Sequence, residues 1–157
     1  MPLHDKYQSQ LEDAQQFEDH VERQLYQAGL PIGVHHSRHF QVRYGESRAG
    51  VEIKFDRMFR DTGNLFIETA ERHHRDAELK PAGIYGKGCM IAIGDYQRFW
   101  LFCMKTLRHL HKAHEKGGPR YSRKETVTAE GFLLPVADAS RFATLVIEAE
   151  IAEEAQP

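Results

Sequence analysis

The stretch YGESRAGVEIKFDRMFRDTGNLFIE, residues 44–68, carries the pattern that decides the fold. Apolar and charged residues alternate through its middle, in the order Val51, Glu52, Ile53, Lys54, Phe55 and Asp56. Alternate side chains of a strand point to opposite faces, with same-face neighbours about 7 Å apart, so this run predicts a strand with one core face and one charged face. The charged face is either the ordinary solvated side of a half-buried strand or a functional surface.

Glu46 lies in the turn before this strand, and a second alternating run at 40–44 predicts a hairpin that returns Glu46 toward Glu52. Two carboxylates at one point supply what Mg²⁺ takes from a protein, because this ion also keeps water and binds phosphate oxygens. Lys54 would then be a fixed cation beside the ion, able to hold or deprotonate an attacking water and to offset charge on phosphorus. The predicted chemistry is phosphodiester hydrolysis.

A helix is expected upstream of this region, over residues 6–28. Phe17, Val21 and Leu25 recur at a spacing of four, and Gly29 provides the stop.

Strands and helices are also expected downstream. Pro135 marks the last strand as an edge strand, and Ser140 caps the final helix. The expected strands are 64–70, then 89–95 or 98–102 or both, and 130–136, and the expected helices are 104–118 and 140–154. This order of elements indicates an α/β sandwich with a mixed sheet.

The composition limits the class of protein. A chain of 157 residues favours a single domain over residues 1–157. Its 41% hydrophobic and 28% charged residues are typical of a soluble globular protein, and no run approaches the roughly 18 apolar residues of a membrane span. The N-terminus lacks the features of a secretory signal, so we expect a cytoplasmic protein without membrane contact. The two cysteines are expected to be reduced core residues.

The string YGES…VEIKFD resembles the PD-(D/E)XK nuclease superfamily, whose core motif is an acidic residue in a hairpin followed by Glu/Asp-x-Lys on the next strand. Over residues 44–84, EIKFDRMFRDTGNLFIE and KPAGI are similar to small phage-associated and bacterial members. The resemblance implies a restriction-endonuclease-like αβββαβ core with a central mixed sheet flanked by helices. It also implies a DNA endonuclease that uses Mg²⁺, with Mn²⁺ as a substitute.

The resemblance implies roles for individual residues. Glu46 and Glu52 become metal ligands and form the catalytic set with Lys54, although the superfamily more often has Asp where Glu46 stands. In relatives a glutamate of the first helix joins the metal shell, and Glu18 is the matching residue here. A turn of about 100° per residue places Glu18 beside the apolar arc of its helix, while Glu22 lies nearer to solvent. A solvated helix carboxylate is the alternative interpretation of Glu18.

Three further residues are expected to support the site, because metal ligands need partners of their own. Asp56 shares the charged face and is a candidate partner of Lys54, whereas Glu68 faces either the site or water. Asn64, in the Thr-Gly-Asn turn, completes this group.

The formal net charge is −2, so any site for a polyanion must be local. Basic residues that flank the acidic motif predict a DNA track, since phosphate contacts need only positive charge within reach. The first candidates are Arg57, Arg60, Lys80 and Lys87, followed by Lys105, Arg108, Lys112, Arg120, Arg123 and Lys124. The ten histidines form no HExxH motif and are interpreted as solvated or phosphate-facing.

Two other functions remain open at this point. One is a catalytically inactive factor on the same fold that binds DNA or protein, for example a phage-encoded inhibitor or accessory protein. The other is an interaction module unrelated to nucleic acid, which predicts no salt-sensitive DNA binding. For the endonuclease, a homodimer is expected, because a small chain must reach both strands of a duplex.

Overall fold

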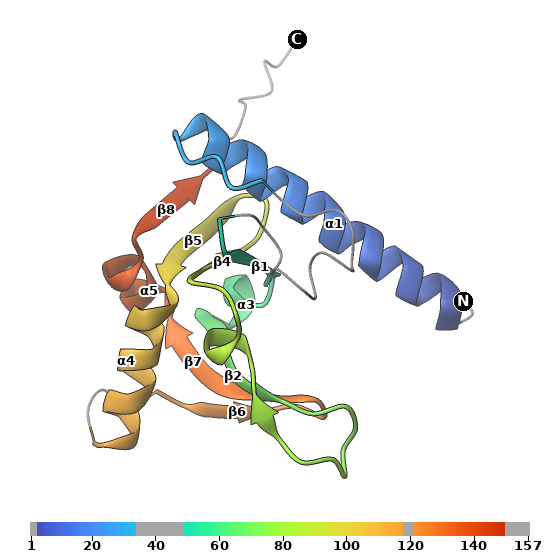
Figure 1. Ribbon diagram of the computed structural model, residues 1–157, viewed down its shortest axis with the longest axis vertical. Coiled ribbons are helices and arrows are strands. Elements are labelled where there is room, and N and C mark those ends of the chain that lie inside the picture. The colour runs from blue at the N-terminus through green and yellow to red at the C-terminus, as the bar shows by residue number, and fades with distance from the viewer. Residues whose placement is uncertain (1–2, 34–48, 118–120, 150–157) are drawn as a thin grey trace.

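The computed structural model describes residues 3–33, 49–117 and 121–149. Its strands form two four-stranded sheets, and a long helix lies across one face of the first sheet (Figure 1). The elements in chain order are α1 Leu3–Gln27, β1 Val51–Phe55, α3 Phe59–Thr62, β2 Asn64–Glu71, β3 Lys80–Pro81, the 3₁₀ helix η1 Gly83–Tyr85, β4 Met90–Gly94, β5 Arg98–Cys103, α4 Met104–Glu115, β6 Arg123–Glu125, β7 Ala129–Pro135, α5 Val136–Phe142 and β8 Leu145–Glu148.

The first sheet is mixed and has the strand order β1-β4-β5-β8. β1 runs parallel to β4, whereas β5 pairs antiparallel with both β4 and β8. The expected mixed α/β fold is therefore confirmed. The expected strand at 40–44 lies outside the described residues.

Helix α1 covers one face of the mixed sheet with the residues that its periodicity singled out. Phe17, Val21 and Leu25 are buried there against Val51, Ile53 and their neighbours on β4 and β5. The helix ends where predicted, and Gly29 follows it with φ +83°. The charged positions of β1 consequently point to the face opposite α1, because alternate residues of a strand face opposite sides.

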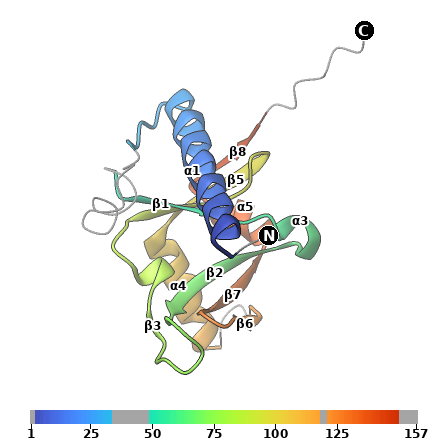
Figure 2. The ribbon, with the colours of Figure 1, turned by 90° about the vertical axis from the view of Figure 1, so that its right-hand side faces the viewer.

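The second sheet is antiparallel, with the order β3-β2-β7-β6, and the sequence did not predict it as a separate layer. Leu65 and Ile67 of β2 pack in one core with Ile91, Ile93 and Trp100 of the first sheet. Helix α4 lies beside both sheets and adds its own apolar side chains to this core (Figures 1 and 2). The molecule is thus layered as helix, mixed sheet, core and antiparallel sheet.

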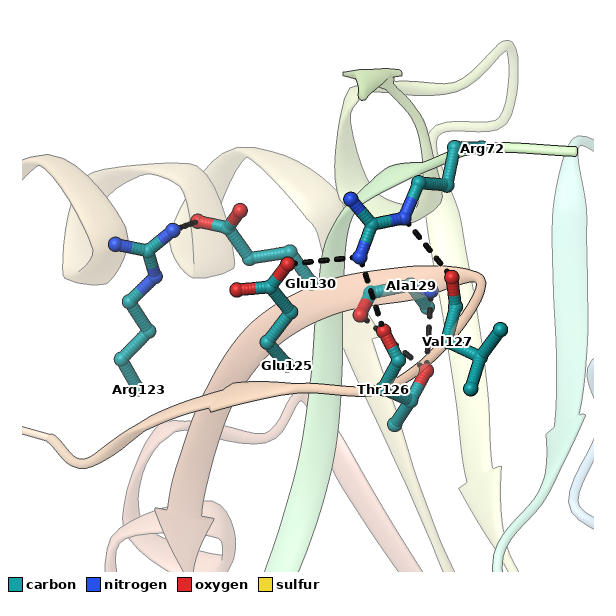
Figure 3. A network of polar contacts seen from close by, with 7 residues as sticks. All are labelled: Arg72, Arg123, Glu125, Thr126, Val127, Ala129 and Glu130. Atoms are coloured by element: carbon teal, nitrogen blue, oxygen red, sulfur yellow. Dashed lines mark hydrogen bonds and ion pairs between the residues drawn. The ribbon is translucent and has the colours of Figure 1, made fainter. Parts of the chain in front are cut away.

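Polar contacts stabilise the second sheet at the end where β2 finishes and where β6 is joined to β7 (Figure 3). Arg72, the residue after β2, donates from Nε to the Val127 carbonyl at 2.9 Å and pairs through Nη2 with Glu125 at 2.8 Å. Arg123 of β6 pairs with Glu130 of β7 at 2.7 Å. The β6–β7 hairpin is thereby tied to β2 as well as to itself.

The prediction that β7 is an edge strand was wrong. β7 lies between β2 and β6. Pro135 is its last residue, opposite Asn64, so the missing N–H falls at the end of the ladder, where a proline is tolerated.

The predicted final helix was also wrong. Ser140 lies inside the short helix α5, where its Oγ accepts a hydrogen bond from Trp100 Nε1 at 3.0 Å. The chain then forms strand β8, which pairs with β5. Both faces of this strand are used, because Val146 packs on the core between the sheets and Ile147 on the core under α1.

The cysteines were misplaced by the sequence interpretation. Both are free, as expected, but Cys89 is exposed and Cys103 is only partly buried. Among the described residues, no helix is long and apolar enough to cross a membrane.

Candidate functional site

Glu52 lies on the face of β1 that points away from α1, in register with Ile91 of β4. It is half-buried, and its carboxylate accepts a hydrogen bond from the Gly88 backbone N–H. Burial raises the pKa of Glu52, and the negative charge of Glu68 adds to the increase. The Gly88 hydrogen bond and the positive charges of Lys54 and Arg108 act against it. Glu52 is therefore a partly desolvated carboxylate with both positive and negative side chains near it.

Lys54 connects this strand to the second sheet. Its Nζ lies 3.3 Å from Oε2 of Glu68 on β2. The Lys54 side chain is 46% exposed and that of Glu68 is 13% exposed, so the ammonium group reaches solvent while the carboxylate is largely enclosed. Of the two orientations left open for Glu68, the structure shows the one toward the site.

Asp56 and Asn64 have local structural roles. The Asp56 carboxylate accepts hydrogen bonds from the backbone N–H groups of Met58, at 2.9 Å, and Phe66, at 3.1 Å. Asn64 donates from Nδ2 to the Thr62 carbonyl at 3.0 Å. Asp56 thus holds the end of β1 to β2, and Asn64 closes the turn. That Asp56 also supports Lys54 stays a prediction.

Glu18 is not brought to Glu52 and Lys54. Helix α1 lies on the opposite face of the mixed sheet, so β1 and its neighbours separate the Glu18 helix from the charged face. Glu18 is half-buried on its own side, and burial raises its pKa to about 7, with Asp19 contributing. The expected role of Glu18 in a shared metal shell does not fit this arrangement. Glu46 lies outside the described residues.

The segment 83–88 approaches Glu52 closely, and the sequence interpretation missed it. A Cβ atom on Gly86 would lie 3.1 Å from Glu52 Oε1, and one on Gly88 would lie 3.1 Å from Glu52 Cγ and 2.9 Å from the Gly50 carbonyl. Only glycine fits easily at such distances. Three glycines within GIYGKG were the available signal, since clustered glycines often mark close backbone approach.

The first four candidates for the DNA track differ in their surroundings. Arg57, Lys80 and Lys87 are exposed, and the Arg57 guanidinium lies 5.2 Å from the centre of the Phe55 ring. Arg60 instead binds both carboxylate oxygens of Asp95, which is buried. Burial opposes ionisation of Asp95, but this pair and two backbone N–H groups hold its pKa below the ordinary value. Arg60 therefore has a structural role, because its guanidinium group is paired with a buried carboxylate.

Several later candidates also have partners within the protein. Arg123 pairs with Glu130 (Figure 3), and Lys124 Nζ lies 5.6 Å from the centre of the Phe66 ring. Arg108 points inward to the segment 83–88. Lys105 and Lys112 are exposed on α4, whereas Arg120 lies outside the described residues.

The expected Mg²⁺ ion needs oxygen ligands, and the described residues around Glu52 can be compared with that need. No three His, Cys, Asp or Glu side chains in the described parts of the chain form a metal-binding group. Magnesium needs fewer protein ligands, because it is usually bound by one or two carboxylates together with water and phosphate oxygens. Glu52 and Glu68 supply hard oxygen donors whose charges interact, so the residues fit this ion.

No protein-family model, curated protein or solved structure matches this chain.

Proposed function

We propose that this chain is a metal-dependent endonuclease of the PD-(D/E)XK type that hydrolyses DNA phosphodiester bonds. The observation that supports this most directly is the meeting of three side chains from two sheets. Lys54 Nζ lies 3.3 Å from Glu68, and the half-buried Glu52 interacts electrostatically with both residues. Lys54 thus pairs with one largely enclosed carboxylate and shares a strand face with a second, half-buried one.

Glu52 and Glu68 would hold the Mg²⁺ ion, with Glu46, which lies outside the described residues, as the further acidic ligand. When bound, this ion supplies positive charge that polarises a phosphoryl oxygen and acidifies water. The enclosure of Glu68 and the burial of Glu52 suit this role, because carboxylates that are partly removed from water gain most from a nearby cation.

Lys54 would act on the attacking water and on the phosphate. Its ammonium group holds the water by a hydrogen bond and offsets the negative charge that grows on the phosphorus oxygens. Glu68 keeps the ammonium group in place through the 3.3 Å contact. The Lys54 side chain is 46% exposed, which leaves the ammonium group accessible to a phosphate. A homodimer of such chains would bring one site to each strand of the duplex.

Three variants test the proposal. Lys54→Ala should lower the cleavage of plasmid DNA by about 10²-fold or more at saturating Mg²⁺, with DNA affinity nearly unchanged, because one charge-stabilising group is lost. Glu52→Gln should weaken metal binding first, so that raising Mg²⁺ partly restores its cleavage. Lys116→Ala, an exposed lysine just after α4, is the control and should cleave like wild type.

Wild-type cleavage by both Lys54→Ala and Glu52→Gln would reject the proposal. If the wild-type protein binds DNA but cuts none with Mg²⁺ or Mn²⁺, the inactive binding factor becomes the better assignment.

A further inference from the structure

The segment 83–88 is placed against the charged face of β1 at both of its ends. At its start, a Cβ on Gly83 would lie 2.1 Å from the Glu68 carbonyl, so η1 rests directly on β2. At its end, Gly88 donates its N–H to the Glu52 carboxylate. The segment thus touches both carboxylate-bearing strands.

Arg108 of α4 holds the middle of this segment. Its Nε donates to the Ile84 carbonyl at 2.5 Å, and its Nη2 reaches the Gly86 carbonyl at 3.5 Å. Its guanidinium carbon also lies 5.8 Å from the centre of the Tyr85 ring. One guanidinium group therefore contacts three residues of the segment.

A second contact from α4 reinforces the first. The Tyr85 hydroxyl and His111 Nδ1 are 2.7 Å apart, and the His111 ring stacks on Phe132 of β7. The segment is consequently held to a helix whose apolar side is part of the main core.

We infer that Arg108 is a positioning residue of the site, which acts by holding the segment 83–88 so that the Gly88 N–H fixes the carboxylate of Glu52. The catalytic consequence of this inference rests on the proposed nuclease function. The geometric part does not, since it concerns only the contact between Gly88 and Glu52.

The shape of the Arg108 side chain allows a positioning role to be distinguished from a purely electrostatic one. A planar guanidinium group presents several N–H donors at fixed angles, whereas an ammonium group is a single point of charge. Lysine at position 108 would keep a positive charge near Glu52 but would lose the paired contacts to the Ile84 and Gly86 carbonyls. Arg108→Lys should therefore differ from wild type if Arg108 acts by holding the segment 83–88 in position. It should behave like wild type if only the positive charge at position 108 matters.

The test compares Arg108→Ala, Arg108→Lys and the control Lys116→Ala, which changes an exposed residue just after the same helix. The first readout is amide hydrogen exchange at Gly88 in the full chain without DNA. In Arg108→Ala this amide should exchange about tenfold faster, because its hydrogen bond to Glu52 is no longer enforced. Amides of β5 should keep their wild-type rates. Glu52→Ala should produce the same local change, and Lys116→Ala none.

The second readout is cleavage kinetics. Arg108→Ala should lower kcat about tenfold with little change in KM for DNA, and Arg108→Lys should recover only part of this loss. Unchanged Gly88 exchange in Arg108→Ala, equal acceleration of all amides, or full recovery by Arg108→Lys would overturn the inference. If the wild-type chain cuts no DNA, the proposed function fails, and the exchange data still decide the role of Arg108.

Discussion

Glu18 is the residue whose ionisation is most clearly linked to folding. It is half-buried on α1, and burial raises its pKa from 4.5 to about 7, with the neighbouring Asp19 acting in the same direction. The folded protein therefore retains a proton on this carboxyl group over a pH range in which the unfolded chain releases it. The contribution of Glu18 to stability is complete below pH 4.5 and is lost as the pH rises through about 7.

Replacing Glu18 by glutamine should remove this pH dependence. We expect Glu18→Gln to have a larger free energy of unfolding than wild type at about pH 8 and a similar one at about pH 4, because glutamine resembles the protonated acid. Urea unfolding at the two pH values measures the difference. Glu12→Gln, at an exposed position of the same helix, should show no such trend. A Glu18→Gln variant that is less stable at high pH would show that its carboxylate is instead stabilised as an anion.

At this scale the sequence predicted the placement of some residues of the candidate site better than that of others. Glu52 and Lys54 were predictable because the period of two fixes a shared face along one strand. The helical angle of Glu18 was informative only about its own helix, since it does not reveal which face of a sheet the helix covers. The roles of Gly88 and Arg108 depend on contacts between distant segments, which local pattern does not encode.

Among the elements, α1 is divided into two halves by its packing. Residues 8–16 are exposed, whereas Phe17, Val21 and Leu25 are buried against the mixed sheet. Figure 1 shows the N-terminal half extending past the sheet. The stability that α1 contributes should therefore come almost entirely from its second half.

A pair of truncations tests this division. Phe17→Ala should lower the free energy of unfolding by about 3–5 kcal/mol, because a fully buried aromatic side chain is lost from the core. Leu11→Ala, at a residue that is 44% exposed, should change it by less than about 0.5 kcal/mol. Chemical denaturation followed by circular dichroism measures both. Equal effects of the two truncations would contradict the packing of α1 on the sheet.

The errors in predicted elements share a physical cause. The segment 145–148 lies in a stretch rich in helix formers, yet it becomes β8 because β5 offers an open ladder and apolar surface on both sides. Tertiary pairing outweighs the small differences in intrinsic propensity. The prediction of an edge strand from Pro135 failed for a similar reason. A proline at the end of a strand is compatible with a strand that lies in the interior of its sheet.

For the molecule as a whole, charge is the property that would govern an encounter with DNA, the proposed substrate. A net charge of −2 gives no general attraction to a polyanion, so affinity must come from local cations. Lys87 is exposed and lies within the segment that contacts Glu52, which makes it the cation best placed beside the site.

DNA affinity should accordingly fall as salt rises, with a linear dependence of log Kd on log salt concentration. Lys87→Ala should reduce that slope by roughly 0.9, the change expected when one phosphate contact is lost from duplex DNA. Fluorescence anisotropy with labelled duplex and Ca²⁺ in place of Mg²⁺ measures this, and Lys116→Ala is the control. Binding that does not respond to salt would favour an interaction module unrelated to nucleic acid.

The pairing of β2 with β7 also determines when the second sheet can form during synthesis. Glu68 stands opposite Gly131, a residue that the ribosome adds 63 positions later. At about 5–20 residues per second, translation leaves β2 without this neighbour for roughly 3–13 s. Glu52 and Lys54 emerge first, but the sheet that supports Glu68 cannot close until β7 has left the exit tunnel. Until β7 has emerged, the nascent chain therefore carries Glu68 on a β2 strand that lacks this partner.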